Sequence, residues 1–167
     1  MVTLRDYSIN DVDRLVELAN NENVSRYMVD TFPYPYTRQD AEWWINTGSI
    51  SNDMVNKVIE YHDEFVGGIG IIPQTGWKKH SAEIGYWIGE DYWGKGIATK
   101  ALGLMTDMVF RELNYQKLFA GVLSPNIASM KVMEKCGYVL EGILLKEFKK
   151  NEQLYDCHHY ARLAEIS

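Results

Sequence analysis

The segment Gly89–Lys100 constrains the fold more than any other part of the chain, because it joins a run typical of a strand to the strongest helical pattern in the sequence. Apolar residues then recur at the spacing of one helix face: Ala98, Ala101, Leu102, Met105, Met108 and Val109. Glycines stand at positions 94 and 96, directly before that helix. A helix that crosses from this strand to the next one, at Lys117, implies that the two strands are parallel neighbours.

Three phosphate-binding interpretations compete for the glycine turn. Gly89, Gly94 and Lys95 match the front of a P-loop, but Gly96 stands where that motif needs a hydroxyl to hold magnesium. Gly94 and Gly96 fit the start of a dinucleotide fingerprint, but Thr99 occupies its third glycine position. The third interpretation needs only backbone N–H groups and the helix N-terminus, which together hold a pyrophosphate without a metal. The alternative without a ligand is an ordinary glycine-rich turn.

Hydrophobic periodicity and turn signals predict elements in the order β, α, α, β, β, β, α, β, α, β, β. The expected strands cover 2–6, 54–61, 64–73, 81–89, 117–123, 138–149 and 153–163, and the expected helices cover 10–21, 37–47, 98–111 and 124–137. Short hairpins imply antiparallel neighbours, and the two helical crossovers imply parallel ones. The 167 residues are therefore expected to form one α+β domain, 1–167, with a mixed sheet and helices on its faces.

Composition excludes several classes of function. A formal net charge of −6 argues against nucleic-acid binding, which needs a basic surface, and is compatible with a cationic partner such as an amine. No window approaches the roughly 18 apolar residues of a membrane span, and Arg5 and Asp6 interrupt the region where a signal peptide needs an apolar run. Cys136 and Cys157 are too few for a disulfide scaffold or a zinc site. We therefore expect a cytoplasmic protein with reduced thiols and no membrane or nucleic-acid partner.

The segment Tyr92–Leu102 resembles the coenzyme A signature of the GNAT superfamily of N-acetyltransferases. Ala82–Ile88 resembles the fourth strand of that family, and Asn126–Tyr138 resembles its later helix and turn. The resemblance covers nearly the whole chain, and the ordered set of segments is more specific than any one of them. It implies the GNAT fold, which is a mixed, mostly antiparallel sheet with helices on both faces and splayed central parallel strands. The chain departs from the signature at Trp93, where the family has Gln or Arg.

Two further segments resemble the RimJ/RimL-like branch of that family, which acetylates the N-termini of ribosomal proteins. They are the aromatic loop Asp30–Tyr36 and the C-terminal run Glu141–Leu163. The branch implies a protein N-terminal amine as acceptor. A small amine, such as a polyamine or an aminoglycoside, fits the acidic charge equally well.

The resemblance implies acetyl-CoA as the acetyl donor and no metal. The fourth strand would pair with the pantetheine arm through its backbone, as a peptide adds to a sheet edge, and the glycine turn would hold the pyrophosphate. The residues implied for cofactor binding are Tyr86, Trp87, Ile88, Trp93, Gly94, Lys95, Gly96, Ile97, Ala98, Thr99, Asn126 and Ser129.

Acetyl transfer needs a neutral amine, so a base is useful, and Glu83 is the first candidate. It lies in the strand before the phosphate turn, and a Glu in a partly apolar cleft has a raised pKa suited to a base near neutrality. In several family members an acidic residue on this strand serves as base. The alternative role is to orient the acceptor. Glu60 and Glu64, near a hairpin tip, are weaker candidates.

The departing thiolate needs a proton, and Ser129 is the candidate acid. It shares a helix face with the apolar Val132, Met133 and Cys136, so its hydroxyl points inward. The alternative is a hydrogen bond to its own helix. Many family members place an acidic tyrosine in this helix, but Met133 occupies that position, whereas the RimJ/RimL-like branch has a serine matching Ser129. Tyr138 is a reserve donor.

Aromatic residues of the first half are candidates for the acceptor site. Phe32, Tyr34 and Tyr36, with Glu83, are expected to bind the acceptor, and core packing is nearly as good an account of Trp43 and Trp44.

The sequence therefore predicts an N-acetyltransferase that uses direct attack in a ternary complex, since no cysteine is well placed as a nucleophile. The alternative of another class is a non-catalytic acyl-CoA-binding module. A monomer or a homodimer is expected.

Overall fold

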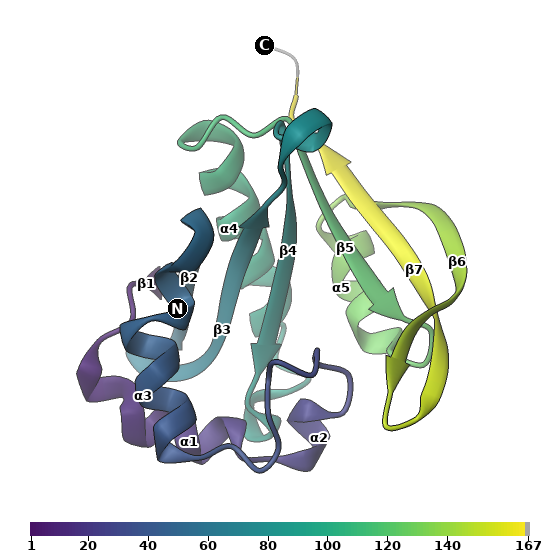
Figure 1. The fold of residues 1–167 in the computed structure, drawn as a ribbon. Helices are drawn as coiled ribbons and strands as arrows, with labels where there is room; N and C mark the ends of the chain where they lie inside the picture. Colours follow the sequence, from purple (N-terminus) through teal and green to yellow (C-terminus); the bar gives the residue numbers. More distant parts are fainter. Residues whose placement is uncertain (166–167) are drawn as a thin grey trace.

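The structure is a computed structural model and describes residues 1–165. Within them, seven strands form one sheet in the order β1-β2-β3-β4-β5-β7-β6 (Figure 1). The strands are β1 (Val2–Arg5), β2 (Val55–Tyr61), β3 (Glu64–Pro73), β4 (Ser81–Ile88), β5 (Lys117–Leu123), β6 (Val139–Lys150) and β7 (Gln153–Leu163). Among these seven described strands, only β4 and β5 pair in parallel. This confirms the predicted mixed, mostly antiparallel sheet.

Helices cover both faces of the sheet, as predicted. They are α1 (Val12–Ala19), α2 (Glu22–Ser25), α3 (Arg38–Asn46), α4 (Ile97–Arg111) and α5 (Ile127–Lys135). The short α2 was not expected from the sequence. In the described part of the chain, no helix is both long and apolar enough to cross a membrane.

Each face of the sheet has its own apolar core. Most of the predicted stripe of α4 is buried on one face, where Leu102, Met105 and Val109 are 0% exposed and pack with α5 residues. Ala98 and Met108, at the margin of the stripe, are only partly buried. On the other face, α1 and α3 pack on β2 and β3 through residues such as Leu15 and Ala41. β4 lies between the two cores and contributes side chains to both.

The crossover through α4 produces parallel neighbours, as predicted, but the crossover through α5 does not. β7, rather than β6, lies next to β5 and pairs with it in antiparallel register from Lys117↔Leu163 to Leu123↔Cys157. The tight turn at Asn151 and Glu152, both with positive φ, connects β6 and β7 as one hairpin. Because β7 carries the buried side chains and most of β6 is exposed, burial of apolar surface favours β7 as the inner strand.

The parallel pair separates soon after it begins. β4 and β5 are paired only at Ser81↔Lys117, Ala82↔Leu118 and Glu83↔Phe119. Beyond these residues the two strands diverge toward their carboxyl ends (Figure 1). The predicted splay is therefore present, and Glu83 lies at the point where it starts.

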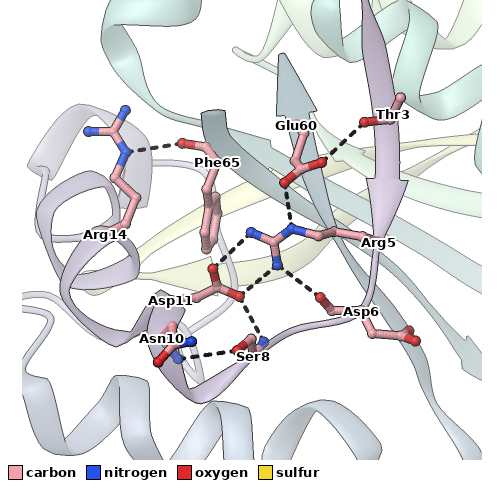
Figure 2. Close-up of polar contacts among 9 residues, drawn as sticks. All are labelled: Thr3, Arg5, Asp6, Ser8, Asn10, Asp11, Arg14, Glu60 and Phe65. Carbon is pink, nitrogen blue, oxygen red and sulfur yellow. Dashed lines mark hydrogen bonds and ion pairs between the residues drawn. The ribbon is translucent and has the colours of Figure 1, made fainter. Parts of the chain in front are cut away.

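A polar network fixes the outer edge of the sheet (Figure 2). The Arg5 guanidinium donates to both oxygens of Asp11, at 2.8 Å each, and its Nε lies 2.5 Å from Glu60 Oε1. Ser8 N also donates to Asp11 at 2.8 Å, which closes a capping box at the turn before α1. This network joins β1, β2 and the entry to α1.

Candidate active site

The turn before α4 has the backbone geometry that anion binding requires. Gly94 and Gly96 have φ of +72° and +73°, a region that glycine enters without steric cost. Space is open where a Cβ would stand at either position. Gly96 is the N-cap of α4 and offers no side-chain acceptor to the first-turn N–H groups of the helix. The turn therefore fits a diphosphate held by main-chain amides.

The side chains of this turn are engaged with the protein itself. Trp93 Nε1 donates to the carbonyl of Ile88 at 2.7 Å, and Lys95 Nζ donates to the carbonyl of Asp91 at 2.9 Å. The indole of Trp93 thus closes the loop, where the family has Gln or Arg. This bond also occupies the Ile88 carbonyl, one of the backbone groups predicted to pair with pantetheine. The first turn of α4, with Ile97, Ala98 and Thr99, contributes through its N–H groups.

An open groove of about 740 Å³ runs beside the turn, between α4 and α5. It is lined by Gly96, Thr99, Lys100, Gly103, Leu104, Asp107, Lys135, Cys136, Gly137 and Arg162. The groove reaches the glycine turn but is not lined by Glu83 or Ser129, so it adjoins the nucleotide end of the site rather than the reacting end.

Glu83 is a partly buried carboxyl group at the mouth of the split. Burial raises its pKa above the ordinary value, and no other cause contributes. Within residues 1–165 it has no ion-pair partner, unlike Glu60, which is bound by Arg5, and Glu64, whose carboxylate accepts from the Tyr92 hydroxyl at 3.0 Å. Of the three predicted carboxylates, only Glu83 is unpaired and lies at the split.

Ser129 meets a partner that the sequence did not reveal. Its Oγ lies 2.9 Å from the Tyr86 hydroxyl, so it does not bond back to its own helix. Asn126 caps α5 by accepting from Ser129 N at 3.3 Å. The Tyr138 hydroxyl instead lies 2.8 Å from Thr106 Oγ1, deep in the core, which removes it from the reacting groups.

Base and acid candidates lie on opposite faces of β4. Side chains alternate along a strand, so Glu83 and Trp87 share one face and Tyr86 shares the other with Ile84. The packing agrees, since Trp87 contacts the α1 and α3 core and Tyr86 contacts the α4 and α5 core.

The predicted acceptor residues differ in accessibility. Phe32 packs on Trp87, with ring centroids 5.5 Å apart, and thus extends the Glu83 face. Tyr34 is 52% exposed, whereas Tyr36 is only 6% exposed and belongs to the core, where burial raises its pKa. Tyr36 therefore has no surface to offer an acceptor. Trp43 is exposed, and Trp44 packs on the same core.

Three residues near the split were missed by the sequence analysis. A Cβ at Gly121 of β5 would meet Cys157 Sγ and the Phe148 ring, both at 2.9 Å. The pKa of the Cys157 thiol is raised to about 11, chiefly by burial and to a smaller extent by the carboxylates of Glu147 and Glu83. Glu147, Phe148 and Cys157 thus lie close together near Glu83. They come from β6 and β7, and no local pattern in the sequence indicates this long-range approach.

A metal ion would need a group of side chains that could bind it. Among residues 1–165, no three His, Cys, Asp or Glu side chains are placed to hold an ion. His159 stacks on Phe119, with centroids 5.2 Å apart, which is a structural role.

The fold and the turn together define the class of N-acyltransferases that use coenzyme A thioesters. Residues 1–139 match the family described as "Acetyltransferase (GNAT) domain". The chain belongs to the GNAT family, and it is an acetyl-CoA-dependent N-acetyltransferase. The predictions of family, enzyme class and acetyl donor are confirmed.

Relatives and solved structures agree with this assignment. The chain is 27% identical to the uncharacterized N-acetyltransferase YnaD of Bacillus subtilis (strain 168), over 97% of this chain and 93% of the relative. It is 29% identical to a spermidine N(1)-acetyltransferase of Vibrio cholerae, over 93% and 88%. A crystal structure of spermidine N-acetyltransferase from Vibrio cholerae, in complex with CoA and spermine, has a TM-score of 0.83 at 28% identity and covers 98% of this chain and 95% of that one. A GNAT acetyltransferase from Bacillus anthracis shares the fold, with a TM-score of 0.87 at 24% identity, and covers 99% and 96%.

Proposed function

We propose that this acetyltransferase moves the acetyl group directly to a small aliphatic amine of the polyamine type. The observation that carries the proposal is the partly buried Glu83 carboxylate, which has no ion-pair partner within residues 1–165 and lies where β4 and β5 separate. A second carboxylate, Glu147, is the neighbour of Phe148 on β6. Aromatic rings of Phe148 and of Trp87 with Phe32 flank the same region. Carboxylates and aromatic faces are what a flexible polycation binds. The similarity to spermidine acetyltransferases supports this acceptor class.

In this proposal each site residue has a defined task. The backbone amides of 94–99 hold the pyrophosphate of acetyl-CoA, and the open edge of β4 beyond Glu83 pairs with the pantetheine arm. Glu83 takes a proton from the amine, directly or through a water, because its raised pKa suits a base near neutrality. Ser129, which lies in α5 and contacts Tyr86 on the opposite face of β4, protonates the departing thiolate.

Direct attack fits the state of both cysteines. Cys136 Sγ donates to the carbonyl of Thr99 at 3.2 Å, and its pKa is raised by burial. Cys157 is buried as well, with a pKa of about 11. Buried thiols with raised pKa values are poor nucleophiles, so a covalent acetyl-enzyme is not expected.

A protein N-terminal amine is the second candidate acceptor. It is favoured by the resemblance of Asp30–Tyr36 and Glu141–Leu163 to the RimJ/RimL-like branch, and by the presence of Ser129 together with Met133 in α5. An α-amine has an ordinary pKa near 7.7–8.0, so it would need less help from a base than a polyamine with amine pKa values near that of lysine.

The test is release of the coenzyme A thiol from acetyl-CoA in the presence of one amine at a time. Spermidine, spermine and putrescine are compared with an aminoglycoside and with short peptides that have free N-termini. We expect kcat/KM for a polyamine to exceed that for every peptide by about 100-fold, which corresponds to about 2.7 kcal/mol. Faster turnover of a peptide would favour the N-terminal acceptor, and binding of coenzyme A without turnover of any amine would favour a non-catalytic module.

A further inference from the structure

The hydrogen bond between Tyr86 and Ser129 links the strand of the base to the helix of the acid. Tyr86 lies on β4 three residues beyond Glu83, where β4 no longer pairs with β5. Ser129 lies in the first turn of α5, which follows β5. Their 2.9 Å contact therefore joins the two sides of the split.

A second hydrogen-bonded pair, Tyr138 with Thr106, provides a comparison for the exposure of Tyr86 and Ser129. The Tyr138 hydroxyl and Thr106 Oγ1 are 2.8 Å apart, and burial raises the pKa of Tyr138 to about 12, as it does for Tyr86. Tyr138 and Thr106 are 2% and 0% exposed, however, whereas Tyr86 and Ser129 are both partly exposed. Two similar pairs of hydroxyl groups thus differ in exposure: parts of Tyr86 and Ser129 reach the surface, and Tyr138 and Thr106 are buried.

A serine hydroxyl alone is a poor proton donor, and a proton that it gives away must be replaced. The Tyr86 phenol, even with its pKa raised to about 12 by burial, is a stronger acid than the aliphatic hydroxyl of serine. Its position 2.9 Å from Ser129 Oγ is a hydrogen-bond distance at which a proton can pass.

We infer that Tyr86 acts through Ser129, holding its Oγ in place and replacing the proton that Ser129 gives to the departing thiolate. The inference rests on the proposed function. The amine nitrogen forms a bond to the acetyl carbon, the carbon–sulfur bond breaks with its electron pair on sulfur, and the amine proton goes to Glu83. Sulfur takes the Ser129 proton, Ser129 takes the Tyr86 proton, and solvent protonates the phenolate as Glu83 releases its proton. Tyr86 is thus a positioning residue whose effect depends on Ser129.

The test compares Tyr86→Phe with Tyr138→Phe, which removes an equivalent hydroxyl from the matched pair in the core. We expect Tyr86→Phe to lower kcat about tenfold with KM for acetyl-CoA and Kd for coenzyme A within twofold of wild type. This loss is smaller than the 10²–10⁴-fold effect of a whole general acid because Ser129 remains. Tyr138→Phe is expected to keep kcat within twofold. Equal kcat values for the two variants, in an enzyme that turns over its amine, would overturn this inference alone.

Two further measurements distinguish a role of Tyr86 in supplying a proton from a purely structural role. Acetyl-seleno-CoA releases a selenolate, which needs no proton because selenols are far stronger acids than thiols, so the loss in Tyr86→Phe should shrink with this donor. The double variant Tyr86→Phe/Ser129→Ala should be no slower than Ser129→Ala, since Tyr86 acts through Ser129. An undiminished loss with the selenoester, or additive losses in the double variant, would contradict the inference. A wild-type protein that turns over no amine would overturn the proposed function and this inference together.

Discussion

Glu83 and Ser129 lie on opposite sides of β4, so in the proposed reaction Glu83 accepts the amine proton on one side and Ser129 donates a proton to the thiolate on the other. The strand turns Glu83 toward the face covered by α1 and α3, and Ser129 lies on the face covered by α4 and α5. In the proposed reaction, an amine that enters on the first face loses its proton there, and the thiolate gains one on the second.

The role of Glu83 as base can be tested with Glu83→Gln, which keeps shape and removes the charge. We expect kcat/KM to fall by 10²–10⁴-fold, the usual contribution of a general base. The acidic limb of the wild-type pH profile should have its midpoint above the ordinary pKa of Glu and should be absent in the variant, since burial raises the Glu83 pKa. Glu64→Gln, at an exposed carboxylate bound by Tyr92, is the control and should retain activity. Equal activity of wild type and Glu83→Gln would reduce Glu83 to an acceptor-orienting or solvated group.

The same substitution is expected to stabilise the fold at neutral pH. The native pKa of Glu83 is raised, so the native state holds this proton more tightly than the unfolded chain does. Its contribution to stability is full below the unfolded pKa and is lost as pH rises through the native pKa. Glu83→Gln should therefore have a higher Tm than wild type at pH 7 and the same Tm near pH 4. Thermal denaturation from pH 4 to 8 measures this, and a lower Tm for the variant at pH 7 would mean that Glu83 has a stabilising partner.

For individual residues, the sequence indicates which face of a strand a side chain occupies, but it does not indicate which distant side chains it contacts. The alternation of side chains along a strand is enough to place Glu83 and Tyr86 on opposite faces of β4. The Tyr86–Ser129 bond joins residues 43 positions apart and depends on the spacing between β4 and α5, which no local pattern encodes. For the same reason, the sequence did not indicate that packing against α1 buries Tyr36, a predicted acceptor residue.

Among the elements, the glycine turn and α4 act as one unit. Two glycines with positive φ, Gly94 and Gly96, form the turn directly before the helix. Trp93 donates a hydrogen bond to the Ile88 carbonyl of β4, and Lys95 donates one to the loop backbone at Asp91. A loop held in this way loses less conformational freedom when it binds an anion.

Gly96→Ala should weaken coenzyme A binding without unfolding the protein. A methyl group at φ +73° costs roughly 1 kcal/mol of backbone strain and projects into the open space above the turn. We expect Kd for coenzyme A to rise at least tenfold, as measured by isothermal titration calorimetry. Gly76→Ala is the matched control, since Gly76 also has a positive φ, +59°, with open space around its Cβ, but lies in the turn between β3 and β4. Similar Kd values for both variants would show that the turn before α4 does not hold the ligand.

Element bounds followed closely from the sequence, whereas the order of the last two strands did not. The predicted helix 98–111 and strand 117–123 match α4 and β5 to within one residue. These bounds depend on local periodicity, glycines and caps. Whether β6 or β7 lies next to β5 depends instead on which strand of the hairpin buries more apolar surface, a property of the assembled sheet.

On the scale of the whole molecule, the candidate site and the polar network that holds the first strand in place involve different strands of the sheet. The split opens between β4 and β5, while the Arg5 network holds β1 to β2, with β3 in between. We therefore expect changes at the outer edge to leave the split unaffected, as long as the sheet stays folded.

Arg5→Gln tests this separation. Removal of the guanidinium leaves Asp11 and Glu60, whose side chains are 10% and 18% exposed, without their cation. Breaking a fully buried pair costs about 3–5 kcal/mol, and Arg5 is about a third exposed, so we expect a loss of roughly 2 kcal/mol and a fall in Tm of about 4–8 °C. Kd for coenzyme A at 25 °C should stay within twofold of wild type. Arg38→Gln, at the exposed pair with Glu42, should leave Tm nearly unchanged. A large rise in Kd for Arg5→Gln, with the fold intact by circular dichroism, would mean that the edge and the split are coupled through β2 and β3.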